Sequence, residues 1–519
     1  MDASRISTVT CLTERIRESF GSALTFQSLM QVYVLTIMVG VLVYSTGGSS
    51  MSNCVVPADL QLPAILIPYL LVLVAAGVVC GAIRRVVSYS FGDLSRILKR
   101  LDLALNILRW TTIVIFYVDL WLLGWFELVH GWMGDHIVID KLITVAPAMF
   151  VPVAMWWLYY PVDRELRRLS ISPQRWTRFE YVASQVRHQI LLVMTPLVLI
   201  MAWSEVIDRI ITQDHPLSDW HVIISFCGTL MVFAFTPLVM RFVWDTQPLE
   251  DGELRLRLRM MCKQYSVRVS ELLRWNTHGS LINAAVMGIM GRVRYILLSD
   301  ALLARMRDDH IEAICAHELG HVRRHHMIGL VVCALGTLSG IWLAIEGVAF
   351  GCGVLFGWNF LDALEYSLVQ LDDPAVEHSY LWSFMLALVT MGSVIGMMIM
   401  WALVFGYVSR RFERQADTFA VQHLSRAYPD PTNHPDVVSS KAASIMIDAL
   451  RVVAELNHIP ITHRSWRHGS IAWRMAYIRS LIGKPIESPA IDRVVTWIFV
   501  AAGMALAVSL AYQYWMDML

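Results

Sequence analysis

Long apolar stretches recur along this chain, and they limit the folds that are open to it. Nine apolar spans are predicted, at 29–46, 63–83, 107–128, 141–160, 189–204, 219–241, 327–350, 379–408 and 492–513. A helix of about 20 residues crosses the roughly 30 Å hydrocarbon core of a bilayer, and each span is near that length. The span at 189–204 is short and contains Pro196. The sequence therefore predicts a polytopic membrane protein that is mainly α-helical.

The composition agrees with a membrane protein. Hydrophobic residues make up 56% of the chain and charged residues 16%. The 42 basic and 42 acidic residues balance, so the charge gives no reason to expect a nucleic-acid partner. The eight cysteines form no CxxC pair, and we interpret them as small buried hydrophobic residues.

Basic residues alternate between the loops and predict an orientation. They cluster after the second span and after the fourth, whereas the connections at 47–62 and 351–378 contain no Lys or Arg. Basic residues near span ends stay in the cytoplasm, which places the N-terminus and the segments near 308–326 and 409–417 on the cytoplasmic side. Asp119, Glu127 and Glu346 lie within spans, as charged residues of transporters do, but the strongest motifs lie outside the spans.

The sequence Ala-His-Glu-Leu-Gly-His at 316–321 predicts hydrolytic chemistry. His317 and His321 are four residues apart, so on a helix both imidazoles can reach one zinc ion while Glu318 acts as general base for an attacking water. A bare HExxH arises by chance in about one chain in a hundred of this length. Asp308 and Asp309 predict a helix start before the motif, and we expect the helix to continue into the span at 327–350.

A second segment, Ser409–Asp417, can complete the site. Glu413 and Asp417 are also four residues apart, so Glu413 can be the third zinc ligand while Asp417 orients a ligand histidine from behind. His325 is a further step of four from His321, but Glu413 has the stronger claim. We interpret His325 and its neighbour His326 as marking the boundary between water and membrane. Cys315 should face away from the ligands, because it lies two residues before His317.

Together, the HELGH and SRRFERQAD segments resemble the membrane-embedded zinc metallopeptidases of the M48 class, the HtpX-like and CAAX-protease (Ste24-like) group. Two further segments carry the resemblance. Asn283–Gly288 with Arg294–Asp300 resembles the strand pair that precedes the catalytic helix in that group. His468–Arg474 is similar to its HPxxxxR segment, with Gly469 in place of the usual proline. The resemblance covers roughly residues 241–326 and 409–485.

This resemblance implies roles for residues that spacing alone does not identify. The strand at 283–288 is expected to be an open edge that pairs with an extended substrate, which makes Asn283 and Ala284 candidate binding residues. His468 and Arg474 are expected in the wall of the active site, where they stabilise the oxyanion and support the ligands. His463 and Arg467 lie nearby, so the sequence leaves open which histidine and which arginine take these roles. Strands are predicted at 267–275, 281–290 and 293–299.

The predicted fold is a membrane bundle of about nine helices with a zincin-like cytoplasmic α+β catalytic domain split by two spans. Its parts are a membrane region at 1–240, catalytic parts at 241–326 and 409–490, a two-span insertion at 327–408 and a last span at 491–519.

The predicted function is zinc-dependent hydrolysis of peptide bonds in membrane-associated proteins at the cytoplasmic face, with one Zn²⁺ per chain and no nucleic-acid partner. The HtpX-like resemblance favours a bacterial inner membrane. Two alternatives remain open: a narrowly specific CAAX-type processing protease, and a catalytically silent, zinc-stabilised membrane scaffold or regulator.

Overall fold

The computed structural model describes residues 30–42, 56–89, 94–134, 136–168, 177–212, 214–277, 281–356, 380–429, 434–457, 459–487 and 490–518. These residues are mostly helical, as the sequence predicts. The chain divides into two compact units. The first comprises Met1–Leu256, Arg268–Met306 and Val452–Pro460, and the second comprises Arg257–Val267, Arg307–Arg451 and Ile461–Leu519.

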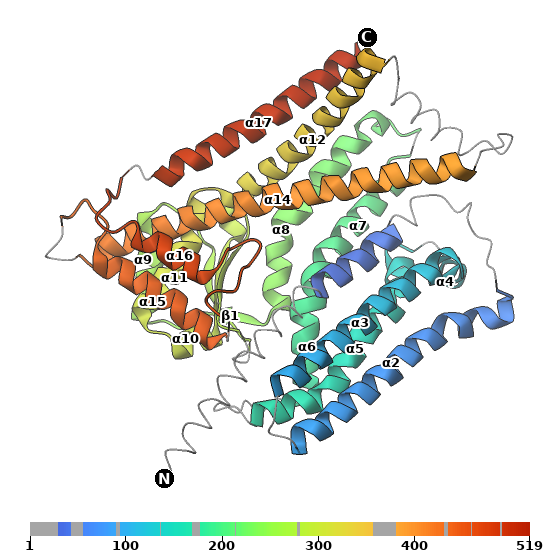
Figure 1. Cartoon of the computed structure of the whole chain (residues 1–519), viewed down its shortest axis with the longest axis horizontal. Coiled ribbons are helices and arrows are strands. Elements are labelled where there is room, and N and C mark those ends of the chain that lie inside the picture. The colour runs from blue at the N-terminus through green and yellow to red at the C-terminus, as the bar shows by residue number, and fades with distance from the viewer. Residues whose placement is uncertain are drawn as a thin grey trace. The chain divides into compact units, whose positions relative to one another are not determined.

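Apolar helices make up most of the first unit. The apolar helix Met30–Leu42 is followed by α2 (Ala58–Tyr89), α3 (Leu94–Trp121), α4 (Trp125–Met133), α5 (Ile139–Arg168), α6 (Arg178–Gln185), the π-helical turn Val186–Leu191, α7 (Leu192–Ile210) and α8 (His221–Val243). Helices α2, α3 and α5 pack together around buried side chains that include Ile65, Phe116 and Trp156 (Figure 1). The Tyr33 hydroxyl donates to the Ala148 carbonyl at 2.6 Å and ties the first helix to α5.

Seven helices of the described residues are long and apolar enough to cross a membrane, and each overlaps a predicted span. They are Ala58–Val86, Arg100–Trp121, Ile139–Glu165, Arg178–Ile210, Ser218–Val243, His326–Ala344 and Ala490–Trp515. The predicted span at 29–46 corresponds to the shorter helix Met30–Leu42. The one at 379–408 lies in the 48-residue helix α14 (Tyr380–Ala427), where only some side chains are described. The count of nine therefore stays a prediction.

Two of the predicted boundaries differ from the structure. The span predicted at 107–128 is interrupted, because Gly124 adopts a left-handed conformation (φ 62°) that separates α3 from α4. The span predicted at 189–204 is longer than expected. The π-helical turn Val186–Leu191 joins α6 to α7, so one continuous apolar helix runs from Arg178 to Ile210 in spite of Pro196.

A four-stranded sheet completes the first unit, in the order β1-β2-β4-β3. Strand β1 (Thr246–Pro248) runs antiparallel to β2 (Glu271–Trp275), β2 runs parallel to β4 (Tyr295–Ser299), and β3 (Ala284–Met287) runs antiparallel to β4. Every residue of β4 is buried, as expected for an inner strand. The three predicted strands form, with shorter bounds, and β3 is an edge strand as expected. Strand β1 is not predicted, because its three residues carry no alternation.

The second unit contains the helix with the HELGH motif. It includes α11 (Asp308–Arg323), α12 (His326–Phe356), α14, α16 (Ile471–Arg479) and α17 (Ala490–Asp517). Helices α9 (Glu253–Gln264) and α15 (Ser440–Leu456) each contribute residues to both units, and the short α10 (Asp300–Arg305) belongs to the first. Within the second unit α12 packs along α17 (Figure 1), and both pack against α14. Phe412 and Cys333 are buried at this contact.

The prediction that the motif helix continues into the next span is wrong. Helix α11 ends at Arg323, and α12 begins at His326. Between them His325 has φ 54°, a left-handed conformation that ends α-helices and that few residues other than glycine adopt. This break turns the chain directly after the motif and changes the position of His326, with consequences for the candidate site.

Candidate metal centre

A close contact between α11 and α14 brings the candidate ligands together. Gly320 lies on the face of α11 that meets α14, and a Cβ atom added there would lie 3.2 Å from the Cα of Ala416 and 3.2 Å from the Cβ of Phe419. Even an alanine would require α14 to shift by a few tenths of an ångström. The glycine of the HELGH motif therefore allows α14 to place Glu413 opposite the two histidines.

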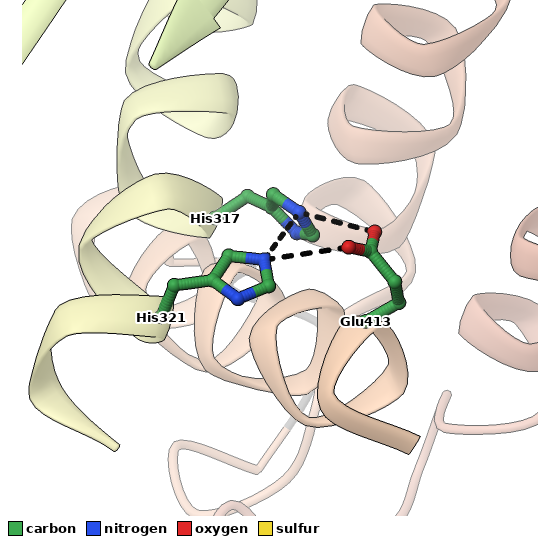
Figure 2. Close-up of side chains that lie close together, drawn as sticks. All are labelled: His317, His321 and Glu413. Atoms are coloured by element: carbon green, nitrogen blue, oxygen red, sulfur yellow. Dashed lines mark hydrogen bonds and ion pairs between the residues drawn. The ribbon is translucent and has the colours of Figure 1, made fainter. Parts of the chain in front are cut away.

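His317, His321 and Glu413 form a compact group of possible metal ligands (Figure 2). The Nε2 atoms of the two histidines are 3.2 Å apart. The Nε2 atom of His317 lies 3.5 Å from Oε2 of Glu413, and that of His321 lies 3.6 Å from Oε1. The structure thus brings together all three residues predicted as zinc ligands, from two helices that are far apart in the sequence.

The geometry of this group fits zinc. Two nitrogens bound tetrahedrally at about 2.0–2.1 Å from one zinc ion lie roughly 3.3 Å apart, close to the separations observed here. Two imidazoles and one carboxylate are also the ligand set of catalytic zinc sites that keep a fourth position open. The side chains of His317 and Glu413 are buried, with exposed fractions of 8% and 4%, while His321 is partly exposed at 26%.

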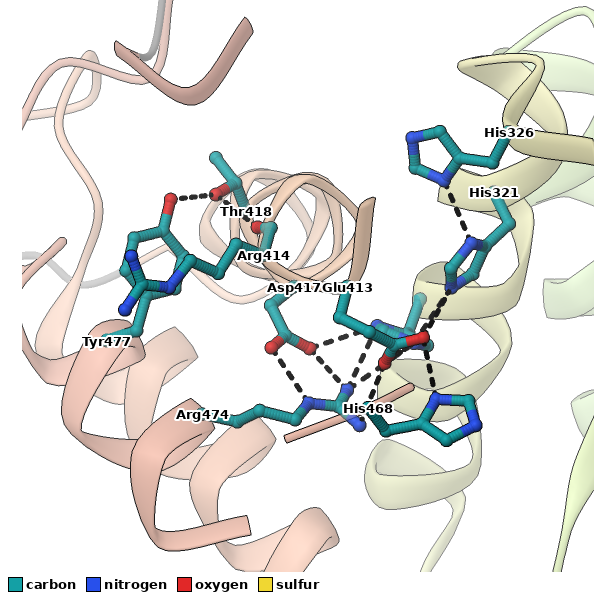
Figure 3. Close-up of polar contacts among 10 residues, drawn as sticks. His321, His326, Glu413, Arg414, Asp417, Thr418, His468, Arg474 and Tyr477 are labelled. Atoms are coloured by element: carbon teal, nitrogen blue, oxygen red, sulfur yellow. Dashed lines mark hydrogen bonds and ion pairs between the residues drawn. The ribbon is translucent and has the colours of Figure 1, made fainter. Parts of the chain in front are cut away.

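Each histidine is held from behind through its other ring nitrogen, and Figure 3 shows this for His321 and His326. The Nδ1 atom of His317 lies 3.0 Å from Oδ1 of Asp417, and the Nδ1 atom of His321 lies 2.8 Å from Nδ1 of His326. Both Nε2 atoms are therefore left to face the candidate metal position. Such contacts fix the tautomer and the orientation of a metal-binding histidine. Asp417 lies where the sequence predicts it, behind a ligand.

Arg474 neutralises the buried carboxylates of the site. Its guanidinium donates to Asp417 through Nε at 3.0 Å and Nη2 at 2.5 Å, and Nη1 lies 3.2 Å from Oε2 of Glu413. Helix α16, which carries Arg474, is docked on α14 by two contacts. The guanidinium of Arg414 lies 4.1 Å above the Trp473 ring, and the hydroxyls of Thr418 and Tyr477 are 2.8 Å apart. Arg474 thus contacts Glu413 and Asp417 and supports the candidate ligands, while its role toward an oxyanion stays a prediction.

His468 lies at the exposed side of the same group. Its Nδ1 atom is 2.8 Å from Oε1 of Glu413, and 54% of its side chain is exposed. The loop that carries it is closed by paired backbone hydrogen bonds between Ser465 and Gly469. Gly469 has φ 74°, so glycine suits this turn in place of the usual proline. Of the histidines and arginines described in this loop, His468 contacts the ligand group, whereas His463 and Arg467 do not.

The charges of the site shift several pKa values. Burial would raise the pKa of Glu413 and of Asp417, but Arg474 and His317 outweigh it and hold both pKa values below the usual range. Burial and Arg474 would lower the pKa of His317, yet its hydrogen bonds to Asp417 and Glu413 raise it to about 9. The site therefore holds two ionised carboxylates, Glu413 among the candidate ligands and Asp417 behind His317.

Glu318 differs from the other acids of the site because its carboxylate is free. It is half-buried, and no described side chain forms a hydrogen bond or an ion pair with it. Burial raises its pKa, with a further contribution from the negative charge of Glu413, while His317 and Arg474 act in the opposite direction. A carboxylate with a raised pKa and no partner is suited to take a proton from an attacking water.

His326 takes part in the site, which the sequence does not predict. It is 2% exposed and lies at the start of α12. Its Nε2 atom is 2.8 Å from Oε1 of Gln415, the Nε2 of Gln415 donates to Asp492 at 2.7 Å, and Asp492 pairs with Arg324 at 2.8 Å. On a continuous helix a residue five positions after His321 would point about 140° away. Only the break at His325 turns it back, and no pattern in the sequence marks that break.

A second polar cluster holds the N-terminal half of α11. The carboxylate of Glu312 accepts from the Tyr428 hydroxyl at 2.7 Å and lies 3.0 Å from Nε2 of His423, and Arg257 pairs with Asp308 at 2.9 Å. Burial would raise the pKa of Glu312, but its bonds to His423 and Tyr428 lower it. These contacts join α11 to α9 and α14, which fixes the helix that carries both histidines.

Asn283 and Ala284 lie at the start of the edge strand β3, in the first unit. The backbone of Asn283 pairs with Ser299: the amide of Asn283 donates to Oγ at 3.1 Å, and its carbonyl accepts from the Ser299 amide at 3.0 Å. The Asn283 side chain is exposed and that of Ala284 is buried. Strand β3 is paired on one side in the described sheet, so its other edge can accept an extended chain. Substrate binding there stays a prediction.

Comparison with known proteins agrees with this geometry. Residues 274–482 match the peptidase family M48. The CAAX prenyl protease 1 of Saccharomyces cerevisiae is 25% identical over 223 residues, which cover 41% of this chain and 48% of that protein. An uncharacterised metalloprotease of Bacillus subtilis, YhfN, is 24% identical over 219 residues, covering 41% of this chain and 47% of that protein. The chain thus spans about half the length of the curated relatives it matches.

A solved structure of Ste24p from S. mikatae is similar to 82% of this chain over 100% of its own length, with 14% sequence identity and a TM-score of 0.41. The match to the M48 family includes all four segments on which the sequence resemblance is based, from the strand pair to Arg474.

Proposed function

We propose that this chain, which carries a domain of peptidase family M48, is a membrane-embedded zinc endopeptidase. One observation supports this most directly. His317, His321 and Glu413 converge with separations suited to zinc, and the carboxylate of Glu318 lies beside them without a partner of its own among the described residues. A metal site that only stabilises the fold does not require a free, half-buried carboxylate beside its ligands.

Each residue of the candidate site has a separate role in the proposed peptide hydrolysis. His317, His321 and Glu413 would hold zinc, which would supply a Lewis acid for the peptide carbonyl and for the attacking water. Glu318 removes a proton from the attacking water and delivers it to the leaving amine. His468 is exposed and donates to the developing oxyanion. Asp417 and Arg474 hold His317 and Glu413 in place.

The position of the site in the chain suggests the kind of substrate. His321 lies five residues before His326, where α12 begins as a candidate membrane span. The Nδ1 atoms of these two histidines are 2.8 Å apart, so a metal held by His321 would lie close to the start of this span. We therefore propose that substrates are membrane-associated proteins, cut at extended segments close to the cytoplasmic surface. Cytoplasmic orientation rests on the distribution of basic residues.

Purified full-length protein tests the proposal against a membrane-anchored reporter with an unfolded segment. We expect Glu318→Gln to keep about one zinc per chain and to lose cleavage by about 10²- to 10⁴-fold, the usual contribution of a general base. Glu253→Gln, an exposed acid in the first turn of α9, is the matched control and should cleave like the wild type. Equal cleavage by wild type and Glu318→Gln would refute the role of Glu318.

The relative from S. cerevisiae is named as a CAAX prenyl protease, which favours a second candidate, a processing protease specific for lipidated C-termini. Two reporters that differ only in a C-terminal prenyl group separate the candidates. Cleavage of both at similar rates supports a general endopeptidase, whereas cleavage of the prenylated one alone supports the processing protease. If neither is cut by zinc-loaded protein, the chain is a zinc-stabilised scaffold.

A further inference from the structure

An open cavity of about 370 Å³ lies in the second unit, separate from the candidate ligands. Three arginines line it, Arg323 and Arg324 at the end of α11 and Arg426 at the end of α14, together with Tyr265, Glu487 and Asp492. Its volume lies in the lower part of the range typical of small-ligand sites, roughly 300–1,000 Å³. Neither the proposed hydrolysis nor the ligand group requires three arginines here.

The arginines of this cavity are only partly neutralised. Arg324 pairs with Asp492 at 2.8 Å. Within the described part of the chain, Arg323 and Arg426 have no carboxylate at ion-pair distance, and both are exposed. The remaining acid, Glu487, is exposed. Two guanidinium groups without carboxylate partners therefore face one cavity, and the fixed fork of N–H donors on arginine is suited to the oxygens of a phosphate.

The same cavity lies where two apolar helices begin. Arg323 and Arg324 come directly before α12, whose candidate span is His326–Ala344. Asp492 lies in the first turn of α17, whose candidate span is Ala490–Trp515. These helices pack side by side (Figure 1), and a Cβ added to Gly336 of α12 would meet the backbone of Ala502 in α17. The two candidate spans thus begin close together, and in a bilayer the start of a span lies near the lipid phosphates.

We propose that this cavity binds the phosphodiester headgroup of an anionic membrane lipid, with Arg323 and Arg426 as its principal contacts. Free phosphate shares the chemistry of that group, but a soluble anion gains nothing from a cavity at the beginning of two spans. A lipid is already concentrated there and oriented with its phosphate at this depth. The cavity would hold one lipid headgroup against α11, α14 and the first turn of α17.

Native mass spectrometry of the full-length, detergent-purified protein tests the proposal. The ligands are phosphatidylglycerol, phosphatidylcholine and inorganic phosphate, and the readout is bound lipid mass, which does not depend on peptidase activity. We expect the double variant Arg323→Gln/Arg426→Gln to bind phosphatidylglycerol about tenfold more weakly than the wild type. The control Arg451→Gln/Arg493→Gln removes the same charge from exposed arginines outside the cavity and should change binding by less than about twofold.

A variant that binds the lipid more tightly separates the proposal from misfolding, because a misfolded protein would not gain lipid affinity. Glu487→Gln removes the exposed carboxylate of the cavity and should strengthen phosphatidylglycerol binding by about two- to threefold, in line with an exposed charge interaction. Unchanged binding in both the double variant and Glu487→Gln would overturn the proposal. Displacement of the lipid by millimolar inorganic phosphate would assign the cavity to a soluble anion, and equal retention of phosphatidylcholine would overturn its preference for anionic lipid.

Discussion

Replacement of Asp417 by asparagine tests the proposed support of the metal centre. Asp417 is fully buried and accepts from three nitrogens: Nδ1 of His317 at 3.0 Å, and the Nε and Nη2 atoms of Arg474. Asparagine has nearly the same shape, but one of its two terminal groups is a donor. With its oxygen in the place of Oδ1, asparagine can still accept from His317 and from Nη2 of Arg474, but its NH2 group then faces the Nε donor of Arg474. Arg474 keeps only Glu413 as a buried counter-charge.

The expected losses follow from these contacts. Partners that orient a metal ligand are worth roughly 10- to 100-fold in affinity, which corresponds to about 1.4–2.8 kcal/mol of zinc binding. Breaking a buried ion pair costs about 3–5 kcal/mol of stability, and we expect the lower end because Arg474 keeps its contact with Glu413. Zinc affinity is measured by competition with a chromophoric chelator at neutral pH, and stability by thermal unfolding of the zinc-free protein.

The control for this experiment is Asp448→Asn, which removes an exposed acid paired with Arg451 at 3.3 Å and should leave both quantities nearly unchanged. If Asp417→Asn binds zinc as tightly as the wild type, then Asp417 does not orient His317 for the metal. A loss of stability with unchanged zinc affinity would make Asp417 a purely structural partner of Arg474.

Three further changes test other parts of the structure. Gly320→Ala should weaken zinc binding by about tenfold, because its Cβ would separate α11 from α14, whereas Gly252→Ala, which has open space, should not. His326→Ala should weaken zinc binding by about 10- to 100-fold. The control His325→Asn should bind zinc normally, because asparagine tolerates the left-handed backbone at this position. Equal zinc affinity of the two variants would refute the role of His326. The folded state lowers the pKa of Glu312 below its ordinary 4.5, so its contribution to stability is present above about pH 4.5 and lost as pH falls through the folded pKa. The difference in melting temperature between wild type and Glu312→Gln should therefore shrink below about pH 4.5, and a difference independent of pH would contradict this.

The helical spacing of the motifs predicts much of the candidate site. His317 and His321, like Glu413 and Asp417, are four residues apart, so each pair shares a helix face and one pair can meet the other. The structure brings these four residues together. The resemblance to the M48 class adds His468 and Arg474, since their positions depend on a loop and a helix that spacing cannot place.

What the sequence could not predict depends on backbone geometry and on contacts between distant segments. The role of His326 needs the left-handed backbone of His325, a conformation that histidine adopts rarely. The hydrogen bonds from His326 through Gln415 to Asp492 join three helices that no local pattern connects. Strand β1 is too short to show alternation, and the π-helical turn before α7 lengthens a span that Pro196 suggested was weak.

The separation of the ligands along the chain affects the biogenesis of the protein. His317 and His321 are synthesised before α12, whereas Glu413 lies in the second half of α14 and is synthesised after α12 and most of α14. Two histidines alone do not complete a three-ligand site. On the proposed function, zinc would be captured firmly only after the intervening helices have entered the membrane and folded back. In this order of assembly, a nascent chain would stay inactive toward neighbouring proteins until its own insertion is finished.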